Sequence, residues 1–157
     1  MKITFLTVGK TEDAYLKDGI DKYVKRLKHY TKLELIDIPE LKNTKALTEQ
    51  QQKVREAELI LKKTSPLDHV ILLDEKGMEL SSIQFAAYID KKSISSTSSL
   101  VFVVGGPYGF DQSVYERAND KLSLSQMTFS HQMIRLFFTE QLYRAFTILK
   151  GEPYHHE

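Results

Sequence analysis

The sequence predicts one α/β domain, with a parallel-dominated sheet covered by helices on both faces. Strand-like and helix-like segments alternate along the whole chain, as parallel sheets require, because each parallel connection must cross back over the sheet. The chain has 157 residues, of which 41% are hydrophobic and 27% charged, which suits one ordinary globular domain. No internal repeat or break in composition divides it, so we expect residues 1–157 to form one domain.

The first half of the chain supplies predicted strands and helices in alternation. The strands are apolar or alternating runs, and the helices place apolar side chains at helical spacing. Pro66 blocks continuation of the second helix. In chain order the segments are a buried strand at residues 2–8, a helix at 12–29, a strand at 33–38, a polar helix at 43–63 and a short buried strand at 70–73.

The second half continues the alternation. Residues 74–77 are expected to form a turn, and Ser81 with Gln84 has the spacing of a capping box that opens a helix through Tyr88. The remaining segments are a serine-rich connector at residues 93–99, a buried strand at 100–104, a short polar and helical passage, a strand at 121–125 and a long helix at about 132–149. We expect all the strands to share one sheet.

A glycine-rich loop, GGPYGF, follows the buried apolar run at residues 100–104. Pro107 cannot continue a central strand and Gly109 tolerates positive φ, so the backbone of this loop is open to a ligand beyond the strand end. The spacing of Gly105, Gly106 and Gly109 fails the G-x-G-x-x-G dinucleotide fingerprint, and no Lys-Ser or Lys-Thr follows as in a P-loop. From spacing alone, a structural turn and a small-molecule pocket are equally good explanations. The similar loop SQMTFSH at the end of the next strand favours the pocket.

The last predicted helix carries more apolar residues than one buried stripe requires. One face already holds Ile134, Phe137, Phe138, Leu142, Ala145, Phe146 and Leu149, while Met133, Leu136, Tyr143 and Ile148 spill around the cylinder. A monomer would leave part of this surface in water, whereas a symmetric dimer that shares the helix would cover it. We therefore expect a homodimer.

Composition excludes several classes of function. The formal net charge is +1, so binding of a nucleic acid must rest on local clusters of charge. Cysteine is absent, which excludes disulfides and thiolate metal sites and suits a cytoplasmic protein. The N-terminal apolar run is too short for a signal peptide, and no run approaches the ~18 residues of a membrane span. We expect neither a membrane association nor a metal.

Several charged side chains have a structural explanation beside a functional one. A basic cluster at residues 22–32 suits the dipole at the end of the first helix better than it suits an RNA phosphate contact. Glu140 and Arg144 lie four apart, as in an exposed helix pair. His155 and His156 lack partners at metal-ligand spacing and fall in a segment that is by default a disordered tail.

The chain also resembles a known family. The start MKITFLTVGK, the strand and loop VFVVGGPYG, the block LSLSQMTFSHQMIRLFFTEQLYRAFTILKGEPYH and the overall length are similar to the RlmH family of bacterial 23S ribosomal RNA pseudouridine N3-methyltransferases. The resemblance covers essentially the whole chain, and its last third is highly specific. It implies a SPOUT-class fold with a C-terminal trefoil knot, a homodimer, the cofactor S-adenosylmethionine (SAM), and 23S rRNA within the ribosome as substrate. Such knots are rare exceptions to unknotted topology.

The resemblance further implies where the cofactor binds. SAM carries a sulfonium cation and no phosphate, so apolar walls and open glycine backbone suit it. The loops singled out above would surround it. The implied cofactor residues are Leu73, Gly105, Leu124, Ser125, Gln126, Met127, Thr128 and Phe129.

The implied catalytic residues lie on the last helix and in the tail. Methyl transfer is an in-line displacement, so catalysis should rest mainly on holding nucleophile and methyl within about 3 to 3.5 Å of each other. The uridine N3 is protonated at neutral pH, so a base must take or share that proton. His155 is the candidate base, with Tyr154 positioning the target ring. Arg144 would contact phosphate or polarise a carbonyl oxygen, and Glu140 would orient Arg144 or compete as base.

One position departs from the family pattern, in which Tyr-His is usually followed by Lys or Arg. This chain has His156 there, and a neutral imidazole supplies no charge, so RNA binding should be weaker or more pH-dependent. The competing function is a noncatalytic ribosome-assembly or RNA-binding module with the same fold, which need not bind SAM. A hydrolase or nucleotide-dependent enzyme is disfavoured, because no nucleophile motif or metal-ligand cluster is present.

Overall fold

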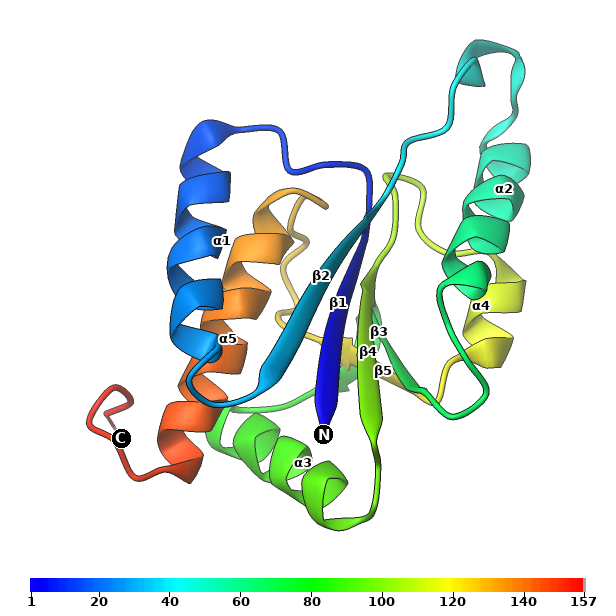
Figure 1. Cartoon of the computed structure of the whole chain (residues 1–157). Helices are drawn as coiled ribbons and strands as arrows, with labels where there is room; N and C mark the ends of the chain where they lie inside the picture. Colours follow the sequence, from blue (N-terminus) through cyan, green and yellow to red (C-terminus); the bar gives the residue numbers. More distant parts are fainter. Residues whose placement is uncertain (157) are drawn as a thin grey trace.

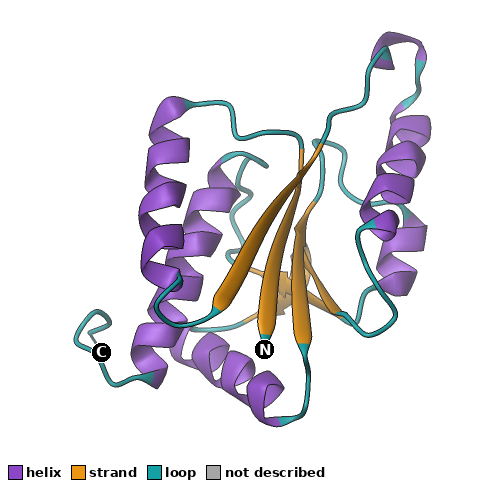
Figure 2. Ribbon diagram, viewed as in Figure 1, coloured by secondary structure: helices purple, strands orange, loops and turns teal. Residues whose placement is uncertain are grey.

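The computed structural model describes residues 1–156 and contains a five-stranded sheet in the order β2-β1-β4-β3-β5 (Figures 1 and 2). Every pairing between neighbouring strands is parallel. The predicted α/β class and parallel sheet are therefore confirmed. The strands are β1 (Lys2–Val8), β2 (Lys32–Ile38), β3 (His69–Glu79), β4 (Ser99–Val104) and β5 (Asp120–Ser123).

Helices cover both faces of this sheet (Figure 2). They are α1 (Ala14–Leu27), α2 (Glu49–Lys62), α3 (Ser82–Ile94), α4 (Gln112–Arg117) and α5 (Met133–Leu149), with a short 3₁₀ helix η1 (Thr44–Ala46) before α2. Figure 1 shows α1, α3 and α5 on one face and α2 with α4 on the other. Each face has its own buried apolar cluster. Successive residues of β4 alternate between these clusters, with Phe102 facing the α5 side and Val103 the α2 side.

Phe138 lies at the centre of the larger cluster. Its side chain is completely buried, and its ring centroid is 4.7 Å from that of Phe5 and 4.7 Å from that of Phe102. Removal of a buried phenylalanine ring typically costs about 3 to 5 kcal/mol of unfolding free energy. Phe138 is therefore a core residue, whereas its neighbour Phe137 is 41% exposed.

Some element boundaries differ from the prediction. Residues 44–46 form the 3₁₀ helix, and α2 starts only at Glu49, because Thr48 and Gln51 form a complete capping box. The turn predicted at residues 74–77 is part of β3, whose pairing with β5 shifts register between Leu73 and Met78. A Cβ at Gly77 would lie 2.6 Å from the backbone nitrogen of Leu122, so glycine permits the close approach of β5.

The start of α5 is attached to the end of β1 by Arg135. This side chain is 1% exposed, and its two terminal nitrogens donate to the carbonyl oxygens of Gly9 and Val8, each at 2.9 Å. Its Nε donates to the carbonyl of His131 at 3.0 Å. The guanidinium therefore fixes the segment before α5 against the carboxyl end of β1.

The trefoil knot remains a prediction, because strand order and register do not describe threading. In the part of the chain that the structure describes, no helix combines the length and apolar character needed to cross a bilayer.

Candidate functional site

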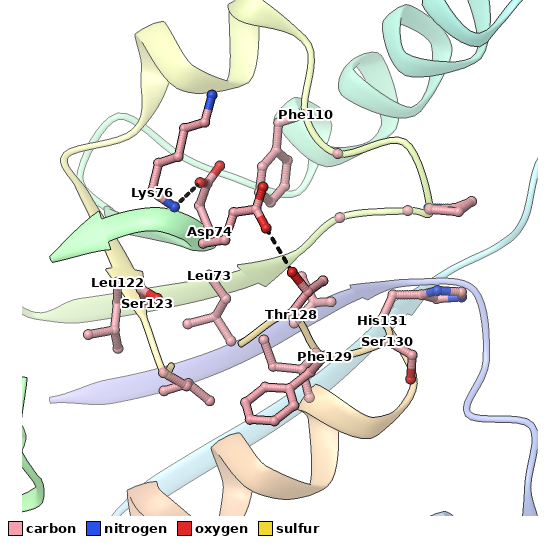
Figure 3. A pocket seen from close by; sticks show the side chains of 18 of the residues that line it. Leu73, Asp74, Lys76, Phe110, Leu122, Ser123, Thr128, Phe129, Ser130 and His131 are labelled. Carbon is pink, nitrogen blue, oxygen red and sulfur yellow. Dashed lines mark hydrogen bonds between the residues drawn. The ribbon is translucent and has the colours of Figure 1, made fainter. Parts of the chain in front are cut away.

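A cavity of about 710 Å³ lies at the carboxyl edge of the sheet, beyond β3, β4 and β5 (Figure 3). Parallel sheets place ligands at this edge, and the volume falls within the roughly 300 to 1,000 Å³ of small-molecule pockets. Its walls are formed by residues 73–76, 104–110, 122–125 and 127–131. Lys53 of α2, Tyr115 of α4 and Ile134 of α5 complete the lining.

The two loops that the sequence indicated as a candidate pocket, GGPYGF and SQMTFSH, both contribute to the wall of this cavity. Its lining includes all the expected cofactor residues except Gln126, namely Leu73, Gly105, Leu124, Ser125, Met127, Thr128 and Phe129. Gln126 instead donates from Nε2 to Oε2 of Glu79 at 3.3 Å.

The glycine loop is both a tight turn and a wall of the cavity. Gly109 has a φ of +82°, and its N–H donates to the carbonyl of Gly106 at 3.2 Å. A Cβ at Gly105 would lie 3.0 Å from Cε1 of Phe110, so any larger residue there must displace the ring. The glycine spacing left open whether this loop is a structural turn or part of a small-molecule pocket. In the structure it is both.

Polar groups that sequence reasoning missed also face the cavity. The Tyr115 hydroxyl donates a short hydrogen bond to the Asp74 carboxylate, and burial together with that carboxylate raises the pKa of Tyr115. Figure 3 shows Thr128 donating to Glu75, with 3.1 Å between the oxygens. Asp74 directly follows the apolar run at residues 70–73. A polar side chain directly after a buried apolar run is a sequence signal for a ligand site, and it could have identified Asp74.

The expected catalytic residues form a separate cluster on α5 and the tail, which we call the tail cluster: Glu140, Arg144, Tyr154 and His155. Arg144 donates from Nη2 to Oε1 of Glu140 at 2.5 Å, and the Tyr154 hydroxyl donates to the same oxygen at 2.8 Å. Nη1 of Arg144 lies 3.2 Å from Nδ1 of His155. The guanidinium carbon stands 4.7 Å from the centre of the Tyr154 ring. The default prediction of a disordered tail, made for His155 and His156, is wrong for His155.

Buried nitrogens in the tail cluster lack hydrogen-bond partners. A guanidinium cannot accept, so Nδ1 of His155 accepts from Arg144, and a neutral imidazole then carries its proton on Nε2. Among residues 1–156, that buried Nε2 has no hydrogen-bond partner, and neither has the buried Nε of Arg144. The cluster therefore presents N–H donors that suit an acceptor-bearing ligand.

The tail cluster and the cavity lie at opposite ends of α5. Ile134 lines the cavity, and Arg144 is ten residues further along the helix, which at 1.5 Å per residue corresponds to about 15 Å. The tail is anchored at its start as well, where the Tyr30 hydroxyl donates to Glu152 at 2.6 Å. Figure 1 shows the segment after α5 next to the last turns of that helix, at the end of the molecule where the strands begin. Within one chain the structure does not bring the predicted catalytic and cofactor residues together.

The basic cluster at the end of α1 adjoins the tail cluster. The guanidinium carbon of Arg26 lies 5.8 Å from the ring centre of Tyr23 and 5.4 Å from that of Tyr143. The Tyr143 ring in turn makes an edge contact with Tyr154, with 4.7 Å between centroids. Lys22, Lys25, Lys28, His29 and Lys32 are at least partly exposed around it. No group of three metal-binding side chains is found in residues 1–156.

Comparisons with known proteins give the class of enzyme. The family model described as "Predicted SPOUT methyltransferase" matches residues 1–155. The chain belongs to the SPOUT methyltransferase family. It is 56% identical over 157 residues to the "Ribosomal RNA large subunit methyltransferase H" of Parabacteroides distasonis, and 55% identical over 157 residues to that of Flavobacterium johnsoniae, covering 100% of both chains in each case. Against the protein of the same name from Cytophaga hutchinsonii it is 56% identical over 156 residues, 99% of this chain and 100% of the other.

Membership of the SPOUT family makes the protein an enzyme that transfers methyl groups. The competing function, a noncatalytic ribosome-assembly or RNA-binding module, is therefore excluded. The family resemblance stated from the sequence is confirmed over the whole chain.

Proposed function

We propose that this SPOUT methyltransferase moves a methyl group from SAM to N3 of a pseudouridine in 23S rRNA, acting in the cytoplasm on the assembled ribosome. The names of the relatives support a large-subunit ribosomal RNA as the substrate. The observation that carries the proposal is the cavity at the carboxyl edge of the sheet, walled by the glycine loop and residues 122–125 and 127–131.

The residues around this cavity fit SAM. Leu73, Leu124 and Phe129 provide apolar surface for an adenine ring, and the glycine loop provides backbone groups. Asp74 and Glu75 provide carboxylates that can face the sulfonium and ammonium cations of SAM, while Lys53 and Lys76 offset their charge over the cavity as a whole. When bound, SAM supplies an electrophilic methyl group on its sulfur. The chain itself must then hold the target base and deal with its proton.

The tail cluster suits the target base. N3 of a uracil ring lies between two carbonyl groups, and the unpaired N–H donors of His155 and Arg144 match such acceptors. Hydrogen bonds to these oxygens stabilise the charge that develops when N3 loses its proton. Glu140 holds Arg144 in place, and the Tyr154 ring offers a surface for stacking. His155 acts as base only after its Nδ1 leaves Arg144, so in the present geometry it acts as a donor.

A second copy of the chain would bring the two halves of the site together. The tail cluster lies about 15 Å along α5 from the cavity of its own chain, and bonds to Glu140 and Tyr30 hold it there. A homodimer packed through α5 would place one tail cluster at its partner's cavity. The active site would then be complete only in the dimer.

Labelled SAM tests this proposal directly. We expect transfer to assembled ribosomes or large subunits, with the label on N3 of one pseudouridine, and much weaker transfer to a short isolated rRNA hairpin. With a formal net charge of only +1, this chain should take most of its specificity from the shape of a large substrate. Equal turnover on the hairpin, or a label on another atom, contradicts the proposal.

A further inference from the structure

Glu56 of α2 is a buried acid that no step proposed above uses. Its side chain is 4% exposed, and Oε1 has no hydrogen-bond partner in the part of the chain that the structure describes. An unpaired buried polar group typically costs about 1 to 3 kcal/mol, and more when it is charged. The residues beside it on the same face, Ala57 and Ile60, are ordinary apolar core residues. An apolar residue would thus be the cheaper choice at position 56 if packing alone mattered.

The carboxyl group of Glu56 lies against the glycine loop. A Cβ placed on Gly106 would be 2.7 Å from both carboxyl oxygens, closer than real contacts allow. Gly106 lines the cavity whereas Glu56 does not. The carboxyl group therefore reaches the cavity only through Gly106. Lys53, one turn earlier on α2, does reach the cavity, so this helix face is directed at the loop.

We propose that Glu56 is a positioning residue for the SAM pocket, which supports the Gly105–Gly106 backbone from α2 and so sets the shape of the cavity wall. This role rests on the proposed cofactor. It assigns Glu56 no contact with SAM and no chemical step.

The charge state of Glu56 is coupled to this role. Burial raises the pKa of its carboxyl group, the side chain of Gln52 opposes the shift, and the nearby charge of Glu40 adds to it. Lys53 on α2 and Tyr115 on α4 line the cavity beside the glycine loop, and Asp111 is the N-cap of α4. The remaining titratable groups are Glu49, Arg55, Glu58 and Lys62 on α2, and Glu116 and Arg117 on α4. An acid with a raised pKa stabilises the folded loop below its unfolded pKa, and this contribution is lost as the pH rises through the folded pKa. The loop should therefore loosen as the pH rises above the ordinary range of a carboxyl group.

Calorimetric SAM binding separates this role from a purely structural one. Glu56→Gln keeps the shape of a protonated acid and should keep SAM affinity within about threefold, while Glu56→Ala should lower it about tenfold. Because Glu56→Ala removes an unpaired buried carboxyl group, we expect it to unfold at the same denaturant concentration as wild type or a higher one. Glu58→Ala, at an exposed position of the same helix, is the matched control and should change nothing.

Two further measurements apply if Glu56→Ala does not fold. The difference in SAM affinity between wild type and Glu56→Gln should grow as the pH rises above the ordinary range of a carboxyl group, and this comparison cancels the titration of SAM itself. Gly106→Ala should weaken binding, and Gly106→Ala with Glu56→Ser should recover part of the loss, because the shorter side chain leaves room for the methyl group. An unchanged pH dependence in Glu56→Gln, or no recovery in the double variant, overturns the role.

Hydrogen exchange of the cofactor-free protein distinguishes a failure of this inference from a failure of the proposed function. The Gly105 and Gly106 amides should exchange faster in Glu56→Ala than in wild type, and Glu58→Ala should leave them unchanged. If wild type binds no SAM but the exchange difference is present, the proposed cofactor is wrong and the support of the loop by Glu56 stands. Equal exchange rates in both variants contradict the role of Glu56.

Discussion

The hydroxyl of Tyr154 donates to Oε1 of Glu140, which precedes it by 14 residues, at a distance of 2.8 Å. The same oxygen accepts from Arg144, so one carboxylate orients both a cation and an aromatic ring. These interactions hold the chain end against the side of α5. Burial raises the pKa of Tyr154, helped by Tyr23 and Glu140, so its hydroxyl stays protonated and remains a donor at neutral pH.

Truncation after Gly151 should lower methyl transfer by at least about 10²-fold, the loss typical of a positioned acid–base group. It removes Tyr154 and His155 but leaves the cavity lining intact, so SAM affinity and dimer formation should be nearly unchanged. Single-turnover transfer and calorimetry measure the two effects. His155→Ala should reproduce part of the loss. If truncation weakens SAM binding as much as turnover, the tail belongs to the cofactor pocket.

Mixed dimers test the shared site. One chain carries the truncation and the other carries Gly105→Val, so that only one of the two composite sites has both an intact pocket and an intact tail. Activity should return at that site. Mixed dimers that stay inactive, although both chains fold and associate, exclude a site built from two chains.

Gly105→Val should abolish SAM binding. Its Cβ would lie 3.0 Å from the Phe110 ring, so the branched side chain displaces either the ring or the loop that lines the cavity. Gly105→Ala with Phe110→Leu should regain part of the affinity in calorimetry, because the smaller side chain accommodates the added methyl group. Undiminished SAM binding in a folded Gly105→Val protein would move the cofactor elsewhere.

Asp120 should make stability depend on acid pH. Burial favours its protonated form, but hydrogen bonds from Tyr88 and His69, both at 2.7 Å, outweigh burial and lower the pKa of Asp120. This contribution is present above the unfolded pKa of about 4 and is lost as the pH falls through the lower folded value. Asp120→Asn should therefore lower the unfolding free energy by about 1 to 3 kcal/mol at pH 7 and by less near pH 3 in urea titrations. Asp90→Asn, exposed on α3, is the control.

Charge reversal in the basic cluster should weaken binding to ribosomes. Lys25 and Lys28 are exposed beside the tail cluster, so Lys25→Glu with Lys28→Glu removes cations close to the proposed target site. Affinity measured by sedimentation should fall, and the slope of its logarithmic salt dependence should decrease by about one for each phosphate that the protein no longer neutralises. Lys62→Glu and Lys91→Glu, on α2 and α3, should have little effect. If all these variants bind ribosomes with the same affinity, the basic cluster serves only the favourable interaction with the dipole at the end of α1.

Phe137 is the position that tests the proposed dimer. It is 41% exposed, and its ring stacks on Phe129 with 4.8 Å between ring centroids. A charged side chain at this position would be solvated in a monomer but buried against apolar surface in the proposed dimer. Phe137→Asp should give monomers in sedimentation velocity experiments, whereas Leu67→Asp, at an 83% exposed position, should not. A wild-type protein that is monomeric at micromolar concentration contradicts the dimer. Phe138 lies on the same predicted helix face as Phe137, but its side chain is completely buried, so its substitution reports on the stability of the core and not on the dimer.

Much of the fold was readable from periodicity. The apolar runs at β1 and β4 and the capping box at Ser81 and Gln84 indicated the correct elements, because burial on both faces and N-capping leave local signals. The helix start at Glu49 and the continuation of β3 past Leu73 were missed. Both depend on choices between competing local structures, a capping box at Thr48 and an irregular pairing with β5.

The cavity was partly predictable and the hydrogen-bond networks were not. Gly105 and Leu124 follow apolar strands, and parallel strands bring their carboxyl ends together, so both residues could be assigned to one edge of the sheet. Glu56 and Arg135 left no signal, since burial of a charged side chain is decided by contacts with residues far away in the chain. Family resemblance pointed to the tail, whose order depends on Glu140 and Tyr30.

Arg135 has a consequence for how the protein is made. Its hydrogen bonds to Gly9 and Val8 join residues separated by 126 and 127 positions. Contacts of such long range are slow to form, since a large loop must close before they stabilise anything. During synthesis, the contacts between β1 and α5 cannot form until α5 has been made. The cavity wall beyond β5 is likewise incomplete until then. A ribosome that stalls before residue 135 therefore carries an unfinished chain with its largest apolar cluster uncovered, a target for chaperones and proteases.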